Sequence, residues 1–148
     1  MSGPGKAVAP SPMIRSLSAY MAKAIDRPLP AKVAEKTKHH IADSLAAIVS
    51  GTKLLPGHKG IEYVATQGGV AQATVMGTKL STSVTLAAFA NAMSAHADET
   101  DDSHQGGLFH PGCAVVPAAW AMGASVAINR VAMSLGVCFI VLCFIVIK

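Results

Sequence analysis

No lysine or arginine occurs between Ser81 and Asn129, and apolar, alanine-rich sequence flanks a polar loop in this stretch. Both flanks have helical spacing but lack the polar face that a solvent-exposed helix needs, so they must be buried on most sides. Of the whole chain, 51% is hydrophobic and 14% is charged, which excludes intrinsic disorder. We therefore expect an all-α, Ala-rich helical bundle in which the loop carries most of the polar chemistry.

The same periodicity and the Pro and Gly stops predict the remaining elements. Residues 1–12 are rich in Pro, Gly, Ser and Ala and are predicted to be a flexible leader, without the apolar core of a secretory signal. A short extended piece is expected at 73–77, and the polar loop at 98–111. The predicted helices cover residues 13–25, 31–49, 57–67, 84–97 (capped by Ser81, Thr82 or Ser83) and 114–128, with Pro117 tolerated only in a first turn.

The formal charge of +4 does not indicate nucleic-acid binding. Ten of the twelve Lys and Arg residues lie in residues 1–80, mostly singly and without interleaved aromatic side chains. Three cysteines without a C-x-x-C spacing indicate neither a disulfide framework nor a zinc knuckle. The expected location is therefore the cytoplasm, and no nucleic-acid partner is expected.

Residues 129–148 form an apolar tail whose uncharged stretch, 131–147, is bracketed by Arg130 and Lys148. This length is at the lower edge for spanning a bilayer. The tail is compatible with a membrane anchor, with a segment buried in a larger assembly, or with the aberrant end of a truncated or frame-shifted product. The abrupt change of composition near Asn129 favours the last, and a membrane anchor is the alternative.

Residues 96–110, which comprise the end of the preceding helix and most of the polar loop, hold half of the acids and half of the histidines of the chain. Four carboxylates so close together repel one another unless a cation, a hydrogen-bond donor or protonation reduces the repulsion. A solvated loop capping helix ends, a divalent-metal site and a metal-free proton-transfer site are the three interpretations that residue types allow. The residues concerned are His96, Asp98, Glu99, Asp101, Asp102, His104 and His110.

The loop and its flanking helices resemble the MmgE/PrpD family. The residues that carry the resemblance are Asn91–Ala97, Glu99–His104, His110–Gly112 and Val115–Ala119, with weaker support from His40–Gly51 and Gly77–Thr78. The resemblance covers roughly residues 13–128, as part of the family's large helical domain, and excludes the tail. It implies a homodimer in full-length members and cofactor-independent elimination, decarboxylation or isomerisation of small di- and tricarboxylic acids.

Carried over by position, the resemblance places Glu99 at the family's site acid, Ser103 at its Ser or Thr, and His110 at its histidine. His104 remains an alternative to His110. Asp98, Asp101, Asp102 and His96 are expected to bind substrate or to orient the loop, and neither a metal nor a cofactor is expected. The hallmark region holds no cation for an anionic substrate, so we expect an amino-terminal fragment with little or no turnover alone.

The predicted function is therefore that of a lyase that acts on a small polycarboxylate by metal-independent proton transfer. The predicted reaction is a dehydration or a decarboxylation, with an isomerisation as a further alternative. Two other classes stay open. One is a small membrane-anchored or structural helical protein without catalysis. The other is a metal-dependent enzyme that uses the Asp and His residues of the loop.

Overall fold

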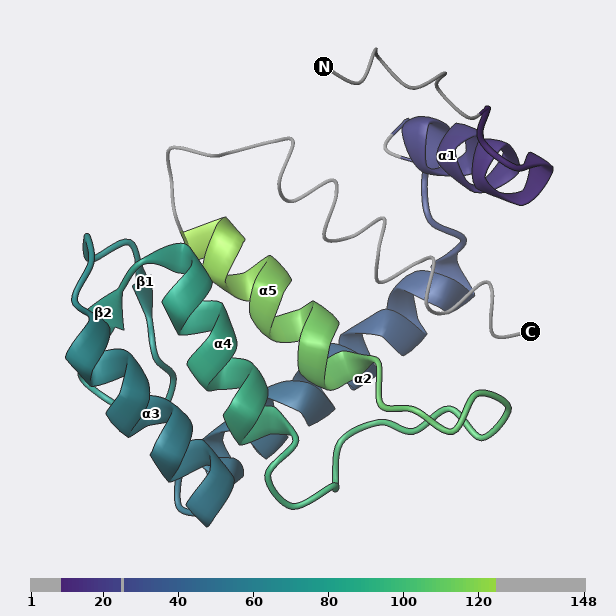
Figure 1. The fold of residues 1–148 in the computed structure, drawn as a ribbon. Coiled ribbons are helices and arrows are strands. Elements are labelled where there is room, and N and C mark those ends of the chain that lie inside the picture. Colours follow the sequence, from purple (N-terminus) through teal and green to yellow (C-terminus); the bar gives the residue numbers. More distant parts are fainter. Residues whose placement is uncertain (1–8, 25, 125–148) are drawn as a thin grey trace, which may run out of the picture.

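The computed structural model describes residues 9–24 and 26–124. Five helices dominate the described part of the chain and confirm the all-α prediction (Figure 1). They are α1 (Pro12–Ala24), α2 (Ala31–Gly51), α3 (Leu55–Gln67), α4 (Val84–Ala95) and α5 (Gly112–Ala124). Two two-residue strands, β1 (Ala73–Thr74) and β2 (Ser81–Thr82), complete the described elements.

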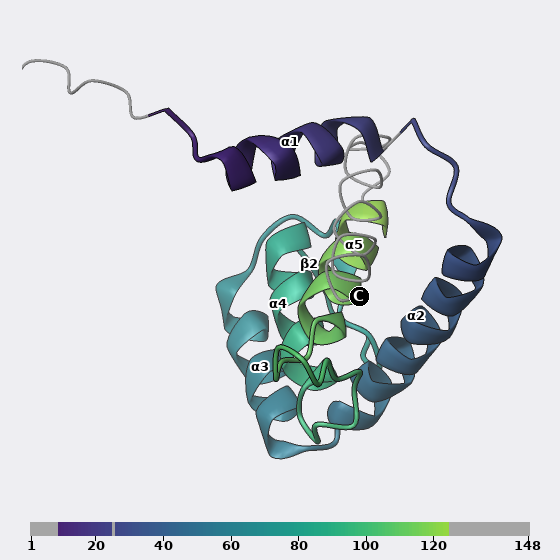
Figure 2. The ribbon, with the colours of Figure 1, turned by 90° about the vertical axis from the view of Figure 1, so that its right-hand side faces the viewer.

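Helix α4 is the centre of the bundle and packs against α2, α3 and α5 (Figures 1 and 2). Its alanines Ala87 and Ala90 are fully buried, as expected for a helix that is apolar nearly all round. Small residues let the neighbouring helices approach closely: a Cβ on Gly51 would overlap the backbone of Ser94. Helix α1 lies at the periphery and has no buried residue.

The extended piece predicted at 73–77 proves to be one half of a hairpin. Strand β1 pairs antiparallel with β2, Ala73 opposite Thr82, around a turn in which Gly77 takes a φ of 72°. The amide of Asn91 on α4 holds this hairpin, since it accepts from Met76 N at 2.8 Å and donates to Thr74 O at 3.3 Å. The pairing therefore depends on a residue that is distant in sequence.

The helix boundaries differ from the sequence predictions at several places. Helix α1 begins one residue earlier, at Pro12, and α2 runs two residues further, to Gly51. Helix α3 begins two residues earlier, at Leu55, because Pro56 fits its first turn. Ser83 alone caps α4, accepting from Leu86 N at 3.4 Å, and α4 ends at Ala95. Helix α5 begins at Gly112, so the expectation that Pro117 lies in a first turn is wrong. It lies in the second turn, fully buried, where its nitrogen cannot donate to the carbonyl of Cys113.

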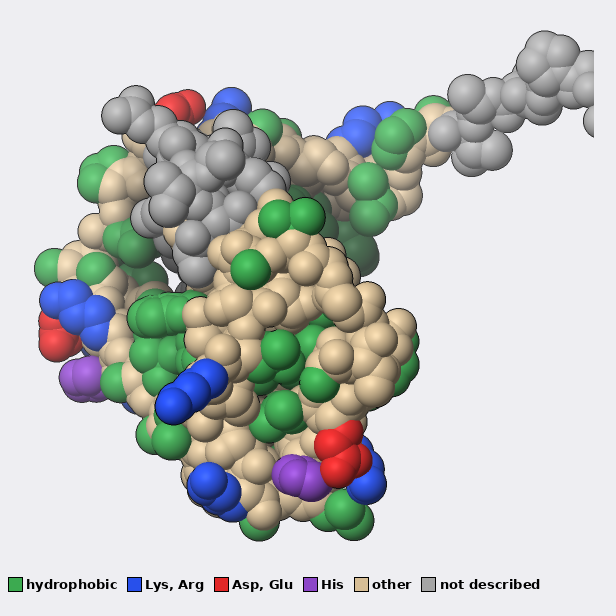
Figure 3. Space-filling view, turned by 90° about the vertical axis from the view of Figure 1, so that its left-hand side faces the viewer, with side chains coloured by type: hydrophobic (Ala, Val, Ile, Leu, Met, Phe, Trp, Pro, Cys, Tyr) green, Lys and Arg blue, Asp and Glu red, His purple; other side chains and the backbone are tan. Residues whose placement is uncertain are grey.

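Several predictions fall on residues outside the described part of the chain: residues 1–8 of the leader, the end of the helix predicted at 114–128, and the apolar tail at 129–148. Among the described residues, no helix combines the length and apolar character needed to cross a bilayer. The Lys and Arg side chains on the face shown in Figure 3 lie in separate places rather than in one stripe.

Candidate functional site

The loop between α4 and α5 is anchored at both ends by packed helices. Helix α4 ends at Ala95, with His96 as its C-cap, and α5 begins at Gly112. The two helices pack against each other and both contact α2. The loop is therefore held over one end of the bundle, where side chains from both helix ends meet.

Asp101 lies between two histidines from the two ends of the loop. Its Oδ1 is 3.4 Å from His96 Nδ1 and 3.3 Å from His110 Nδ1, and the two imidazole rings have centroids 5.1 Å apart. The Asp101 side chain is 0% exposed, whereas those of His96 and His110 are 47% and 27% exposed. A carboxylate buried against two imidazoles can fix the orientation of both rings.

The hydrogen bonding of this cluster is incomplete. His96 is within hydrogen-bond distance of Asp101, but the contact of His110 is not aligned for a hydrogen bond. Asp101 Oδ2 and His110 Nδ1 are buried without a hydrogen-bond partner among the described residues. Such atoms are uncommon in folded proteins and call for an explanation.

Asp102 fastens the loop to the start of α5. Its Oδ1 accepts a hydrogen bond from Gly112 N at 2.7 Å. Burial raises the pKa of Asp102, and the hydrogen bond from Gly112 opposes that rise. A Cβ on Gly112 would overlap Asp102 Oδ1 and lie 2.8 Å from Ser44 Oγ, so this approach requires glycine. The loop-orienting role of Asp102 stays a prediction.

His40 on α2 is a residue that the sequence analysis did not single out. Burial and then the charge of Lys36 lower the pKa of His40, whereas the carboxylate of Asp102 opposes this. His40 thus lies close enough to Asp102 for their charges to interact. Its position four residues before the buried Ser44 places both on one face of α2, which is the signal that could have found it.

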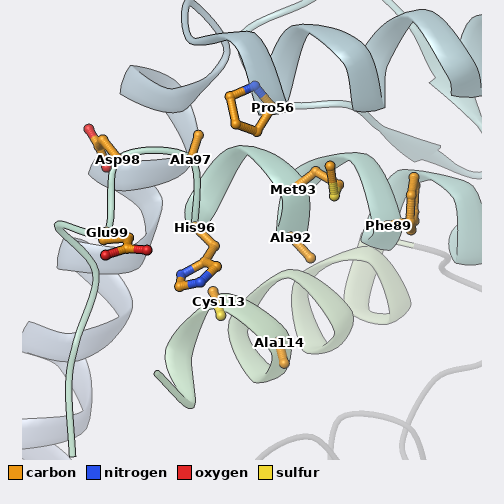
Figure 4. Close-up of a pocket in the computed structure, with 10 residues that line it drawn as sticks. All are labelled: Pro56, Phe89, Ala92, Met93, His96, Ala97, Asp98, Glu99, Cys113 and Ala114. Atoms are coloured by element: carbon orange, nitrogen blue, oxygen red, sulfur yellow. The ribbon is translucent and has the colours of Figure 1, made fainter. Parts of the chain in front are cut away.

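An open pocket of about 650 Å³ lies beside the cluster (Figure 4). Its lining is mostly apolar and comes from α4, the start of α5, the first turn of α3 and the beginning of the loop. Figure 4 shows the His96 ring pointing towards Cys113, with Asp98 and Glu99 on the adjoining loop. The lining residues are Pro56, Phe89, Ala92, Met93, His96, Ala97, Asp98, Glu99, Cys113 and Ala114.

The two acids of the pocket differ in how they are held. Asp98 Oδ1 accepts from the Thr100 hydroxyl at 2.7 Å and from Thr100 N at 3.3 Å, and Asp98 Oδ2 accepts from Ser50 on α2 at 3.4 Å. The Thr100 hydroxyl is the main cause that lowers the pKa of Asp98. Glu99 is exposed and has a positive φ of 55°, a conformation that is uncommon outside glycine and that turns the chain at the pocket rim.

Cys113, at the start of α5, donates from Sγ to the carbonyl of His110 at 3.0 Å. Burial, followed by the charge of Asp101, raises the pKa of this thiol to about 11. Cys113 is therefore a neutral thiol near pH 7, despite its place at a helix N-terminus. Together with His96 and Asp101 it forms a set of three metal-ligand side chains whose donor atoms lie within 4.8 Å of one another.

Two predicted site residues lie away from this cluster. His104 starts a hairpin that projects from the helical body (Figure 1): His104 N donates to Phe109 O at 2.9 Å. Its ring nitrogen Nδ1 accepts from Gly107 N at 2.8 Å. Ser103 is exposed beside it. Of the two histidines left open by the sequence, His110 is the one that lies against Asp101; the catalytic roles themselves stay predictions.

Comparison with known proteins gives one match. The family described as the MmgE/PrpD N-terminal domain matches residues 15–135. Neither the search of curated proteins nor that of solved structures gave a match. The matched range includes the helices α2 to α5 and the whole polar loop at 98–111. Because the match covers most of the chain, the protein belongs to the MmgE/PrpD family, and residues 15–135 are those that match its N-terminal domain.

Proposed function

We propose that this site carries out acid–base proton transfer on a small di- or tricarboxylic acid, as a dehydratase or decarboxylase of the MmgE/PrpD family. The observation that carries the proposal is the buried carboxylate of Asp101 within 3.4 Å of two imidazoles at the edge of a pocket. Family membership supports a lyase-type reaction.

In this proposal, one imidazole removes a proton from the carbon beside a substrate carboxylate. Asp101 orients the ring and stabilises the imidazolium that forms, because opposite charges attract strongly where water is excluded. In a dehydration, the hydroxyl group leaves as water with a proton from a second acid, for which Glu99 at the pocket rim and the other imidazole are the candidates. In a decarboxylation no proton is removed first: the bond from the carbon to its carboxylate breaks, carbon dioxide leaves, and a protonated imidazole donates one proton to the electron pair left on that carbon.

The charge of the pocket bears on how a polycarboxylate is held. None of the ten lining residues is Lys or Arg, and two of them are acids. Among these residues, the ring N–H of His96 is therefore the group that can donate a hydrogen bond to a substrate carboxylate. Ser103 and His104, on the exposed hairpin, keep only the roles that the family resemblance predicts.

The test is the exchange of a carbon-bound hydrogen in D₂O, which needs only the proton-transfer step and not the complete turnover that the sequence predicts to be weak or absent in this chain. The purified chain is incubated with hydroxylated and unsaturated di- and tricarboxylic acids and with a monocarboxylic acid, and deuterium uptake is followed by mass spectrometry. We expect uptake beside a carboxylate in at least one polycarboxylate and none in the monocarboxylate.

Two variants connect this activity to the site. His110→Gln should abolish the uptake, whereas His58→Gln, which changes an exposed histidine on α3, should leave it unchanged. If the folded chain gives no uptake with any polycarboxylate, or if His110→Gln has no effect, the proposed function is wrong.

A further inference from the structure

The side chains of His96, Asp101 and Cys113 meet from three separate segments. They belong to the C-cap of α4, the loop, and the start of α5, so packed helices fix two of the three. One donor atom from each lies within 4.8 Å of the other two, and the His96 Nδ1 to Asp101 Oδ1 distance is 3.4 Å. Figure 4 shows the His96 ring beside Cys113 at the start of α5.

A second observation points to a ligand at the same place. Asp101 is 0% exposed, yet its Oδ2 has no hydrogen-bond partner among the described residues. The Nδ1 atom of the adjacent His110 is also buried without a hydrogen-bond partner among the described residues, although it lies 3.3 Å from Asp101 Oδ1. A buried carboxylate oxygen without a donor is costly, and a bound cation would compensate it.

We propose that His96, Asp101 and Cys113 form a binding site for a thiophilic divalent cation of the Zn²⁺ type. Imidazole nitrogen, carboxylate oxygen and thiolate sulfur are the donors that Zn²⁺ prefers, and three protein ligands leave a fourth position for water. Tetrahedral coordination with these bond lengths places the three donors about 3.3 to 3.7 Å apart. The donors, which lie within 4.8 Å of one another, would therefore need to approach by at most about 1.3 Å on binding.

Cation binding replaces the thiol proton of Cys113, which passes to the solvent as the sulfur–metal bond forms. Burial and the negative charge of Asp101 keep that proton on the sulfur in the free protein, because they raise the thiol pKa. A divalent cation reverses the charge around the thiol and favours the thiolate.

Occupancy of this site would also affect catalysis, a consequence that rests on the proposed function. The cation would engage His96 and Asp101, which the proton transfer needs. Zn²⁺ should therefore inhibit deuterium exchange, rather than support it.

The binding test uses Co²⁺ as a spectroscopic substitute for Zn²⁺ on the full chain. A thiolate bound to Co²⁺ gives a charge-transfer absorption that histidine and carboxylate ligands alone do not give. The chain has two further cysteines, Cys138 and Cys143, so the starting protein is the Cys138→Ser/Cys143→Ser variant. We expect one Co²⁺ per chain with this absorption, displaced by an equivalent of Zn²⁺.

Further changes in this background identify the ligands. Cys113→Ala should abolish the absorption, and His96→Gln and Asp101→Asn should each weaken Co²⁺ binding at least about tenfold. His39→Gln, on the exposed face of α2, is the matched control and should leave binding unchanged. Circular dichroism checks that each variant is folded.

The proposal is overturned if the folded Cys138→Ser/Cys143→Ser variant shows no thiolate absorption at millimolar Co²⁺. It is also overturned if Cys113→Ala retains the absorption. The spectroscopic result does not depend on activity: a Co²⁺ site in a chain without deuterium exchange would keep the metal site and refute the proposed function. Deuterium exchange without Co²⁺ binding would keep the proposed function and refute the metal site.

Discussion

The hydrogen bond between Asp102 and the start of α5 allows a quantitative prediction for the stability of the loop. Asp102→Ala removes the acceptor that lies 2.7 Å from Gly112 N and leaves this buried N–H without a partner. Losing the partner of a buried backbone donor costs about 1–3 kcal/mol. The lost attraction between the carboxylate and the N-terminus of α5 adds about 0.3–1 kcal/mol. We expect Asp102→Ala to lower the free energy of unfolding by about 1.3–4 kcal/mol.

Asp102→Asn separates the hydrogen bond from the charge. The amide oxygen can still accept from Gly112 N, and the variant removes both the burial penalty that raises the pKa of Asp102 and the repulsion by Asp101. These gains offset the weaker attraction to the N-terminus of α5, so we expect Asp102→Asn to change the free energy of unfolding by about 1 kcal/mol or less.

Urea unfolding followed by circular dichroism measures all three proteins, and Asp43→Ala, on the exposed side of α2, is the control for removal of a surface carboxylate. Equal losses for Asp102→Ala and Asp102→Asn would refute the reasoning, because the hydrogen bond would then contribute nothing beyond the charge. A loss for Asp102→Ala no larger than that for Asp43→Ala would refute it as well.

Three further predictions concern packing, pH and thiol reactivity. Gly51→Ala places a Cβ against the backbone of Ser94, so α2 and α4 must separate, and the free energy of unfolding should fall by about 1–3 kcal/mol. A loss below about 0.5 kcal/mol in urea unfolding would contradict the close approach of the two helices. The pKa of His40 is lowered from 6.5 in the fold, so the unfolded chain binds a proton more tightly, and stability should fall as the pH drops through 6.5. His40→Gln should reduce this slope in urea titrations between about pH 5 and 7, and an unchanged slope would show that His40 is not the cause. Because the Cys113 pKa is raised from 9.0 to about 11, iodoacetamide should modify Cys113 about 100-fold more slowly in the folded chain than in urea, and equal rates in peptide mapping would contradict the raised pKa.

The sequence predicted the helical architecture because the periodic apolar positions of α2 and α4 are local signals. It did not predict the β1–β2 hairpin, since the amide of Asn91 holds that hairpin from a separate helix. The prediction for Pro117 failed for a different reason. Helix α5 starts at Gly112, where Asp102 Oδ1 accepts from the first backbone N–H, and that bond depends on loop geometry rather than on local propensity.

The candidate site was predictable in its composition and not in its geometry. The density of acids and histidines identified Asp101, His96 and His110 as candidates, but spacing alone could not separate His110 from His104. That choice depends on the hairpin from His104 to Phe109, which carries His104 away from the helix ends. His40 was missed because its neighbouring lysines suggest a solvated face, and only the packing of α2 under the loop brings it near Asp102.

The role of Asp101 as the partner of both imidazoles is tested most directly by the rate of deuterium exchange in Asp101→Asn. The substitution keeps the size of the side chain and removes the charge that stabilises an imidazolium. We expect the exchange rate to fall at least about 100-fold while His39→Gln stays at the wild-type rate and urea unfolding shows both variants folded. A folded Asp101→Asn variant that exchanges at close to the wild-type rate would contradict the assignment of His96, Asp101 and His110 as the proton-transfer group.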